Sequence, residues 1–274
     1  MTTPLLEIEG LRVEARSEFE TIRAVDDVDL RLDRGRVAGL IGESGSGKTT
    51  LVRSVIGLHQ RNVSITGGRI TLDGTVIYDH ADGTDRQASV RGSRIGTVFQ
   101  QPRGSLNPLK RVGAQLTEVL RTHCGDLDKQ AIGQRARDTL ARMDLDAERV
   151  MRSYPHQLSG GMCQRAAVAI AVATEPELLI ADEATSALDV TSQASLVELL
   201  RELVSERSMS MLFVTHDVLL AAELCDELVV LRSGVAVERG ATADLLADPQ
   251  HDYTKNLIAA VPRWDVAPEE EPAT

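Results

Sequence analysis

The sequence predicts an α/β fold with a helical insertion, and three observations carry that prediction. A short apolar run at residues 36–41 leads through a glycine-rich turn into a helical pattern at 48–58, as expected of a strand covered on both faces. Two more strand and helix pairs follow, at residues 178–204 and 211–224. Residues 102–165 lack strand patterns and contain helical stretches, so we expect a helical insertion there.

The remaining patterns surround these pairs. Residues 5–15 alternate apolar and charged side chains, which is typical of a half-exposed strand. Asp73 and Gly74 are a turn pair between two short apolar runs and predict a hairpin. The other expected elements are strands at 68–72, 76–78, 95–99, 228–231 and 235–238, and helices at 112–121 and 129–143.

Composition and charge limit the possible functions. The 274 residues are 42% hydrophobic and 26% charged, which is ordinary for a globular protein. A formal net charge of −11 argues against nucleic acid as the main partner, because phosphate backbones require a basic face. No apolar run approaches the roughly 20 residues that span a bilayer. We therefore expect a cytoplasmic protein that binds no nucleic acid.

A glycine-rich loop connects the strand at 36–41 to the following helix. Residues 42–49 read GESGSGKT, which matches the phosphate-binding pattern G-x-x-x-x-G-K-[ST] between a strand and a helix. Small residues let backbone N–H groups converge on phosphate oxygens, and the helix N-terminus adds its positive dipole end. Lys48 would neutralise phosphate charge, and Thr49 would be a ligand of Mg²⁺. The expected nucleotide-binding residues are Gly42, Glu43, Ser44, Gly45, Ser46, Gly47, Lys48, Thr49 and Thr50.

Two adjacent carboxylates end the apolar run at residues 178–181. Asp182 would hold Mg²⁺ through water, whereas Glu183 points differently and would polarise an attacking water. Adjacent acids after a strand are common, and by themselves they would be interpreted as a solvated strand end. After a phosphate-binding loop in an α/β chain, they predict a nucleotide hydrolase.

A third motif distinguishes among the many phosphate-loop enzymes. Residues 158–165 read LSGGMCQR and open a helix. Ser159, Gly160 and Gly161 therefore expose unpaired amides at a helix N-terminus, which makes a second anion site. This string resembles the signature motif of ATP-binding cassette (ABC) ATPases, and it precedes the strand of Asp182 as it does in that family.

The resemblance assigns roles to three more residues. Gln100 resembles the Q-loop glutamine, which contacts Mg²⁺ and relays to membrane subunits. The string SALD at 186–189 resembles the D-loop and implies that Asp189 lies at the nucleotide. His216 resembles the switch histidine that touches the γ-phosphate, although alone it would be interpreted as a structural histidine. The implied catalytic residues are thus Glu183, His216 and Gln100, and the metal ligands are Thr49, Gln100 and Asp182.

The family also has an aromatic residue upstream of the phosphate loop that stacks on adenine. Phe19 lies at a suitable distance from the loop. Ala15 and Ile22 are near the same position and are the alternatives. We expect Phe19 to contact the base.

The resemblance further implies how the chain is organised. One ABC-type P-loop nucleotide-binding domain would cover residues 1–264, with an antiparallel β subdomain and a helical subdomain at about 102–165. It would use ATP and Mg²⁺, and each nucleotide would lie between the phosphate loop of one subunit and the signature motif of another. The acidic, proline-containing residues 265–274 are expected to be disordered.

Two segments are similar to ATPases of oligopeptide, dipeptide or nickel importers. They are VFQQPRGSLNP at 98–108 and QHDYTKNLIAAVP at 250–262; the second alone would be an ordinary amphipathic surface helix. The resemblance implies a subunit on the inner face of the cell membrane that energises peptide import. Its partners would be a second ATPase, two transmembrane permeases and an extracytoplasmic substrate-binding protein. A nickel importer, an exporter, and a soluble ABC ATPase of DNA repair or translation are the alternatives.

Overall fold

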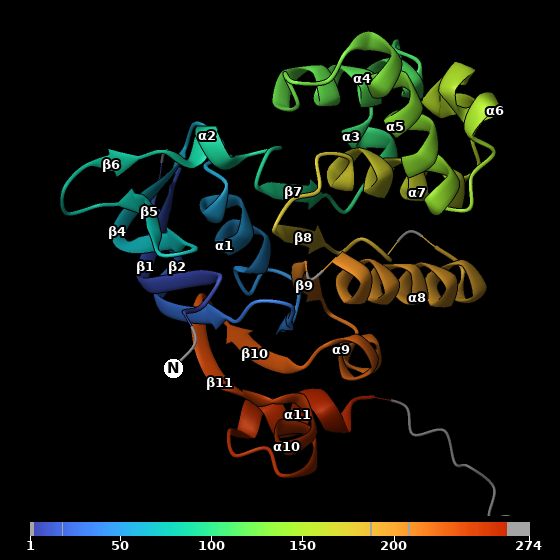
Figure 1. The fold of residues 1–274 in the computed structure, drawn as a ribbon. Helices are drawn as coiled ribbons and strands as arrows, with labels where there is room; N and C mark the ends of the chain where they lie inside the picture. Colours follow the sequence, from blue (N-terminus) through green and yellow to red (C-terminus); the bar gives the residue numbers. More distant parts are fainter. Residues whose placement is uncertain (1–2, 18, 187, 208, 262–274) are drawn as a thin grey trace, which may run out of the picture.

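Two β-sheets and a group of helices make up the fold of the computed structural model, which describes residues 3–17, 19–186, 188–207 and 209–261. In the view of Figure 1 the antiparallel sheet lies at the left, α4 to α6 lie at the upper right, and α10 and α11 lie at the bottom. The expected α/β class is confirmed, with an antiparallel sheet and a helical region.

The strands are β1 (Leu6–Arg16), β2 (Thr21–Leu32), β3 (Val37–Ile41), β4 (Val63–Leu72), β5 (Thr75–Asp79), β6 (Thr84–Asp85), β7 (Ile95–Val98), β8 (Leu178–Asp182), β9 (Ser210–Thr215), β10 (Glu227–Arg232) and β11 (Val235–Ala241). The helices are α1 (Lys48–Val55), α2 (Gln87–Val90), α3 (Pro102–Ser105), α4 (Val112–His123), α5 (Lys129–Arg142), α6 (Ala147–Arg152), α7 (Gly160–Val172), α8 (Val190–Arg207), α9 (Val218–Leu224), α10 (Thr242–Ala247) and α11 (Asp252–Ala259), with a 3-10 turn η1 (Pro155–Gln157).

The mainly parallel sheet has the strand order β11-β10-β3-β9-β8-β7. Its strands β3, β8 and β9 are buried along their whole length, which explains their continuous apolar sequences. On one face Leu40 and Leu212 pack in a core shared with α1 and the antiparallel sheet. On the other face Ile41 and Phe213 pack with α7, α8 and α9. The sheet is therefore a rigid layer between two hydrophobic cores.

The antiparallel sheet has the order β2-β1-β4-β5-β6. Its strand β2 is not among the sequence-based expectations. Asp26 and Asp27 interrupt the apolar alternation of this strand. They lie where the pairing with β1 shifts register, between Leu11 and Val13. Asp27 itself has a left-handed backbone with φ 57. A bulge of this kind conceals a strand from pattern reading.

One expected boundary is wrong. The helix expected at 48–58 ends at Val55, because Gly57 has a positive φ of 63 and stops it. The helical subdomain at about 102–165 stays a prediction; its last position falls inside α7, which continues to Val172. No glycine or proline follows Gly161 within α7, so nothing stops the helix earlier. The expected tail at 265–274 lies outside the described residues.

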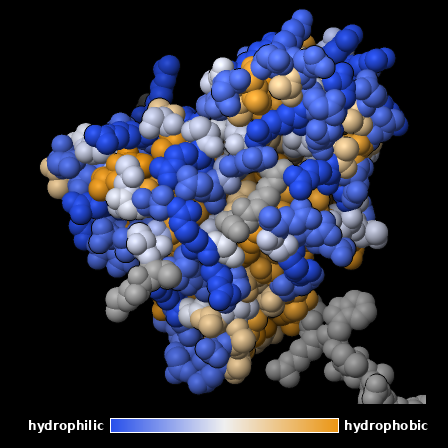
Figure 2. All heavy atoms as spheres, in the orientation of Figure 1, coloured by the Kyte–Doolittle hydropathy of each residue, from blue (hydrophilic) through white to orange (hydrophobic). Residues whose placement is uncertain are grey.

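Within the described ranges, no helix has both the length and the apolar character needed to cross a bilayer. Figure 2 shows that the face in view is mostly hydrophilic, with hydrophobic atoms in separate patches. Isolated surface patches of this kind are normal for globular proteins.

Candidate functional site

Most of the predicted site residues come together at the carboxyl ends of the parallel strands. The phosphate loop follows β3, Glu183 follows β8, His216 follows β9, and Gln100 lies just beyond β7. This edge is where open α/β sheets bind ligands. A cavity of about 900 Å³ lies there. It is lined by Ile22, Arg23, Ala24, Gly42, Glu43, Ser44, Gly45, Gly47, Lys48, Thr49, Thr50, Gln100, Glu183, His216, Ser233, Gly234 and Leu257.

The phosphate loop has a shape that needs glycine. Gly42 and Gly47 have φ values of 150 and 104. A Cβ at Gly42 would collide with the carbonyl oxygen of Leu231, and one at Gly47 with that of Ala24. The loop is therefore closely packed between β10 and β2, and it leads directly into α1 with its free N–H groups.

Lys48 lies inside the loop with 5% of its surface exposed. Its Nζ donates hydrogen bonds to the carbonyl oxygens of Gly42 at 2.7 Å and Glu43 at 2.8 Å. Desolvation lowers the pKa of Lys48, and the charges of Glu183, Asp182 and Glu43 oppose this shift. The ammonium group is thus preorganised beside the space into which nucleotide phosphates would enter.

Thr49 and Asp182 form the expected metal-binding pair. The Thr49 hydroxyl donates to Asp182 Oδ1 at 3.2 Å. Asp182 is buried, and desolvation raises the pKa of its carboxyl group. A hydroxyl and a carboxylate oxygen this close together are the hard ligands that Mg²⁺ prefers. The residues present therefore fit a magnesium ion.

Glu183 lies between two other predicted catalytic residues. Its Oε2 accepts a hydrogen bond of 2.6 Å from Gln100 Nε2, and its Oε1 lies 3.4 Å from His216 Nδ1. The backbone of Glu183 is left-handed, with φ 48, and its N–H donates to the carbonyl oxygen of Val214. An uncommon backbone conformation at a non-glycine residue is typical of functional sites.

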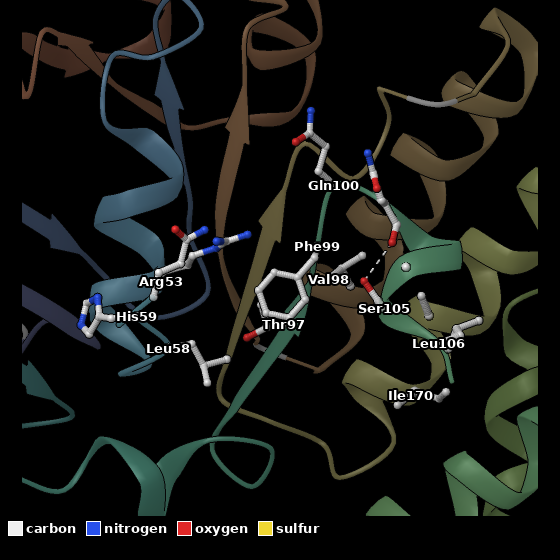
Figure 3. Close-up of a pocket in the computed structure, with 14 residues that line it drawn as sticks. Arg53, Leu58, His59, Thr97, Val98, Phe99, Gln100, Ser105, Leu106 and Ile170 are labelled. Atoms are coloured by element: carbon white, nitrogen blue, oxygen red, sulfur yellow. Dashed lines mark hydrogen bonds between the residues drawn. The ribbon is translucent and has the colours of Figure 1, made fainter. Parts of the chain in front are cut away.

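Gln100 belongs to two cavities. It lines the nucleotide cavity and also a groove of about 760 Å³ between α1, β7, α3 and α7. Figure 3 shows Gln100 at one end of this groove, with Phe99 in the middle and Leu106 and Ile170 along one side. The glutamine therefore connects the hydrolytic site with a second surface of the chain.

Three predicted residues lie at a separate place, at the start of α7. The Ser159 hydroxyl caps this helix by accepting from the N–H of Met162 at 3.2 Å. Gly161 lines a cavity of about 220 Å³ between α7 and α8. Asp189 lies before α8 and accepts from the Ser192 hydroxyl at 2.7 Å, which lowers the pKa of Asp189. The signature segment, with Ser159, Gly160 and Gly161, thus does not line the nucleotide cavity of its own chain.

Phe19 lies in the connection between β1 and β2, and its side chain is 94% exposed. It is not among the residues that line the nucleotide cavity, whereas Ile22, one of the two alternatives, is. Ala15 pairs with Ile22 across the two strands. None of the described residues that line this cavity is Phe, Tyr or Trp.

Sequence reasoning did not anticipate the walls that come from the end of the chain. Ser233 and Gly234, in the turn between β10 and β11, and Leu257 of α11 line the cavity. The strands on either side of this turn, at 228–231 and 235–238, were expected, but the position of the turn beside the phosphate loop depends on tertiary pairing. No local signal in the sequence gives such a contact.

The fold and the site define a phosphate-loop nucleotide hydrolase, and a second predicted anion-binding segment lies apart from its cavity, at the start of α7. A model of the ABC transporter family matches residues 25–186. The chain belongs to this family, and it binds and hydrolyses ATP.

Several curated proteins and solved structures are similar along most of the chain. Two Brucella proteins, from B. abortus strain 2308 and B. ovis, are provisionally named peptide import ATP-binding proteins. Both are 42% identical, over 96% and 97% of this chain and 79% and 80% of their own. A dimeric ATP-binding cassette bound to ADP and Pi has a TM-score of 0.76 at 28% identity, covering 86% of this chain and 98% of that one. CbiO1 of Clostridium perfringens, part of the ABC transporter complex CbiONQ, has a TM-score of 0.74 at 25% identity, covering 89% of this chain and 91% of its own.

Proposed function

We propose that this chain is the ATP-hydrolysing subunit of an ABC importer for oligopeptides or dipeptides. The observation that carries this proposal is the 42% identity to proteins named for peptide import, which extends over 96% of the chain. The importer-like segments at 98–108 and 250–262 support the same class.

The residues of the site have different proposed roles in ATP hydrolysis. The phosphate loop and Lys48 bind the phosphates of ATP, while Thr49 and Gln100 would be ligands of Mg²⁺ and Asp182 would hold it through water. When bound, Mg²⁺ neutralises the charge on the phosphates. Glu183 accepts a proton from the attacking water, and His216, 3.4 Å from Glu183, contacts the γ-phosphate.

The adenine contact belongs to the same proposal. Phe19 is the predicted stacking residue, and its side chain is exposed. To reach the base, Phe19 would have to move toward the nucleotide cavity. The Phe19→Ala variant is expected to bind ATP more weakly. Unchanged ATP affinity would transfer the assignment to the cavity wall around Ile22.

The groove that Gln100 shares is proposed to receive a permease. Its lining includes the apolar side chains Leu58, Phe99, Leu106 and Ile170, which suit an amphipathic cytoplasmic segment of a membrane protein. A second ATPase would present its phosphate loop to Ser159, Gly160, Gly161 and Asp189 of this chain. The complex would thus contain two ATPases and two permeases on the inner face of the membrane, with an extracytoplasmic binding protein.

Affinity capture of the chain from gently solubilised host membranes tests the proposal. Two permeases and a second ATPase should accompany it, and the captured complex in proteoliposomes should hydrolyse ATP faster when the peptide-loaded binding protein is added. A complex with Glu183→Gln is the matched control and should show no stimulation. Stimulation by nickel-loaded binding protein would instead identify a nickel importer. Recovery with permeases in a complex that no binding protein stimulates would favour an exporter, and recovery with ribosomes or DNA alone would exclude transport.

A further inference from the structure

The end of the described chain touches the phosphate loop directly. The backbone N–H of Glu43 donates a hydrogen bond of 3.0 Å to the hydroxyl of Tyr253. Tyr253 lies in the first turn of α11 and is buried. We propose that Tyr253 is a positioning residue, which fixes the phosphate loop at Glu43 in the conformation that binds the phosphates of ATP.

Glu43 connects this tyrosine to the lysine of the loop. While its N–H donates to Tyr253, its carbonyl oxygen accepts a hydrogen bond of 2.8 Å from Lys48 Nζ. A displacement of Glu43 therefore changes the position of the ammonium group. The hydroxyl of Tyr253 acts on the nucleotide through Glu43 and Lys48 and need not touch the nucleotide itself.

The ring of Tyr253 is itself held in place. The guanidinium carbon of Arg232 lies 5.0 Å from the ring centroid, which is a cation–π distance. Arg232 is the last residue of β10 and precedes the turn at Ser233 and Gly234. In that turn the N–H of Gly234 donates to the carbonyl oxygen of Ser46 at 2.9 Å. The loop thus has two supports, and both come from residues beyond the family match at 25–186.

The sequence around Tyr253 builds the helix that carries it. Nδ1 of His251 accepts from the N–H of Tyr253 at 3.0 Å and caps the start of α11. The carboxylate of Glu238, in β11, accepts from the N–H groups of Gln250 and His251 at 2.7 and 3.1 Å. These contacts fix the first turn of α11 against the sheet.

One face of α11 is directed at the nucleotide site. Leu257 lies four residues after Tyr253 and lines the nucleotide cavity. Residues four apart lie on the same side of a helix. The importer-like segment at 250–262, to which the sequence alone gives no chemical role, thereby supplies one contact to the loop and one to the cavity wall.

The Tyr253→Phe variant of the full chain isolates the hydroxyl, because it keeps the ring and its packing on Arg232. Binding of a fluorescent ATP analogue with Mg²⁺ should weaken by about fivefold, the worth of one neutral hydrogen bond. The KM for ATP should rise with little change in kcat. The control is Tyr78→Phe, whose hydroxyl lies 3.4 Å from His80 Nδ1, away from the loop. The control should leave affinity and KM unchanged, and wild-type affinity in Tyr253→Phe would overturn the proposal.

A second measurement follows the Glu43 amide itself. Hydrogen exchange followed by NMR should find the Glu43 amide protected in the wild-type chain, with Tyr253→Phe losing that protection. Fast exchange at Glu43 in the wild type would overturn the proposal, however the variant folds. The inference rests on ATP binding and is independent of the cargo. A wild-type chain that binds no nucleotide would refute both proposals, whereas equal binding by wild type and Tyr253→Phe would refute this one alone.

Discussion

At the scale of single residues, Glu183 shows how the site controls one carboxylate. Its two oxygens face Gln100 at 2.6 Å and His216 at 3.4 Å, and 14% of its side chain is exposed. The left-handed backbone after β8 turns this side chain away from Asp182, its neighbour in sequence. Two adjacent acids therefore have different surroundings, and the pKa of Asp182 is raised by desolvation. Different surroundings suit different roles, one as metal ligand and one as base.

The Glu183→Gln variant should retain nucleotide binding and lose turnover. The amide keeps the shape and can still face Gln100 and His216, but it cannot accept the proton of the attacking water. We expect phosphate release to fall by at least about a hundredfold, the usual contribution of a general base. Titration of the variant with an ATP analogue should give the wild-type affinity. Near-normal hydrolysis would remove Glu183 from its predicted role.

A matched pair of glycine variants tests the close packing of the loop. Gly47→Ala and Gly35→Ala both place a Cβ at a positive φ, of 104 and 68, but only Gly47 has a backbone oxygen in the way. Gly35→Ala should cost about 1–2 kcal/mol of stability and leave nucleotide binding intact. Gly47→Ala should in addition abolish binding of the ATP analogue. Equal binding by both variants would contradict the proposed packing.

At the scale of elements, the buried strands explain what the sequence could predict. β3, β8 and β9 are continuous apolar runs whose ends carry the phosphate loop, Asp182 and His216, so both the strand and its motif are readable locally. β2 was not predictable because its bulge at Asp26 and Asp27 breaks the alternation. Contacts between distant segments, such as Tyr253 with Glu43, leave no local pattern at all.

The central strand β9 should be the most sensitive element to truncation. Phe213 is fully buried there, in the core between the parallel sheet and the helices. Phe213→Ala should lower the free energy of unfolding by about 3–5 kcal/mol, measured by urea denaturation. Leu219→Ala, at a position on α9 that is largely exposed, is the control and should change it by less than about 0.5 kcal/mol. A small effect at Phe213 would mean that this core is loosely packed.

The contact between the starts of β7 and β8 should be sensitive to acid. Arg94 donates two hydrogen bonds to Glu177, just before β8, and this contact holds the pKa of Glu177 below its usual 4.5. The pKa of Glu177 is lower in the folded chain than in the unfolded chain. The contact with Arg94 therefore stabilises the fold at pH values above the unfolded pKa, and this stabilisation is lost as pH falls through the folded pKa. The Tm should therefore drop between about pH 5 and about pH 3, and less steeply in Glu177→Gln. Identical acid profiles of the two proteins would contradict this.

At the scale of the whole molecule, the phosphate loop and the predicted second anion-binding segment lie in different places. The phosphate loop follows β3, whereas Ser159, Gly160 and Gly161 lie at the start of α7, beside another cavity. A dimeric relative of this fold bound to ADP and Pi has been described. In our proposal the signature segment meets the nucleotide of a partner subunit, so each chain supplies half of two sites.

The Gly161→Asp variant tests the signature segment separately from the phosphate loop. A Cβ at Gly161 would meet the Ser192 hydroxyl at an ordinary 3.7 Å, so the fold should tolerate the change. The added carboxylate would repel phosphates at the helix start. Nucleotide affinity of the single chain should be unchanged, while hydrolysis by the assembled ATPase pair should fall by at least about tenfold, equivalent to 1.4 kcal/mol. Loss of affinity in the single chain would show that its two segments share one nucleotide.

The unbroken helix α7 has a mechanical consequence. It runs from Gly160 to Val172, with Ser159 at one end and Ile170, a wall of the groove in Figure 3, near the other. The separation of these two residues is about 16 Å at 1.5 Å per residue. A tilt of about 10° around the Ile170 end would move the Ser159 end by about 3 Å. A hydrogen bond does not survive a displacement of that size. In the proposed assembly, a slight tilt of α7 at the groove would therefore make or break the contact between its Ser159 end and a phosphate on the partner subunit.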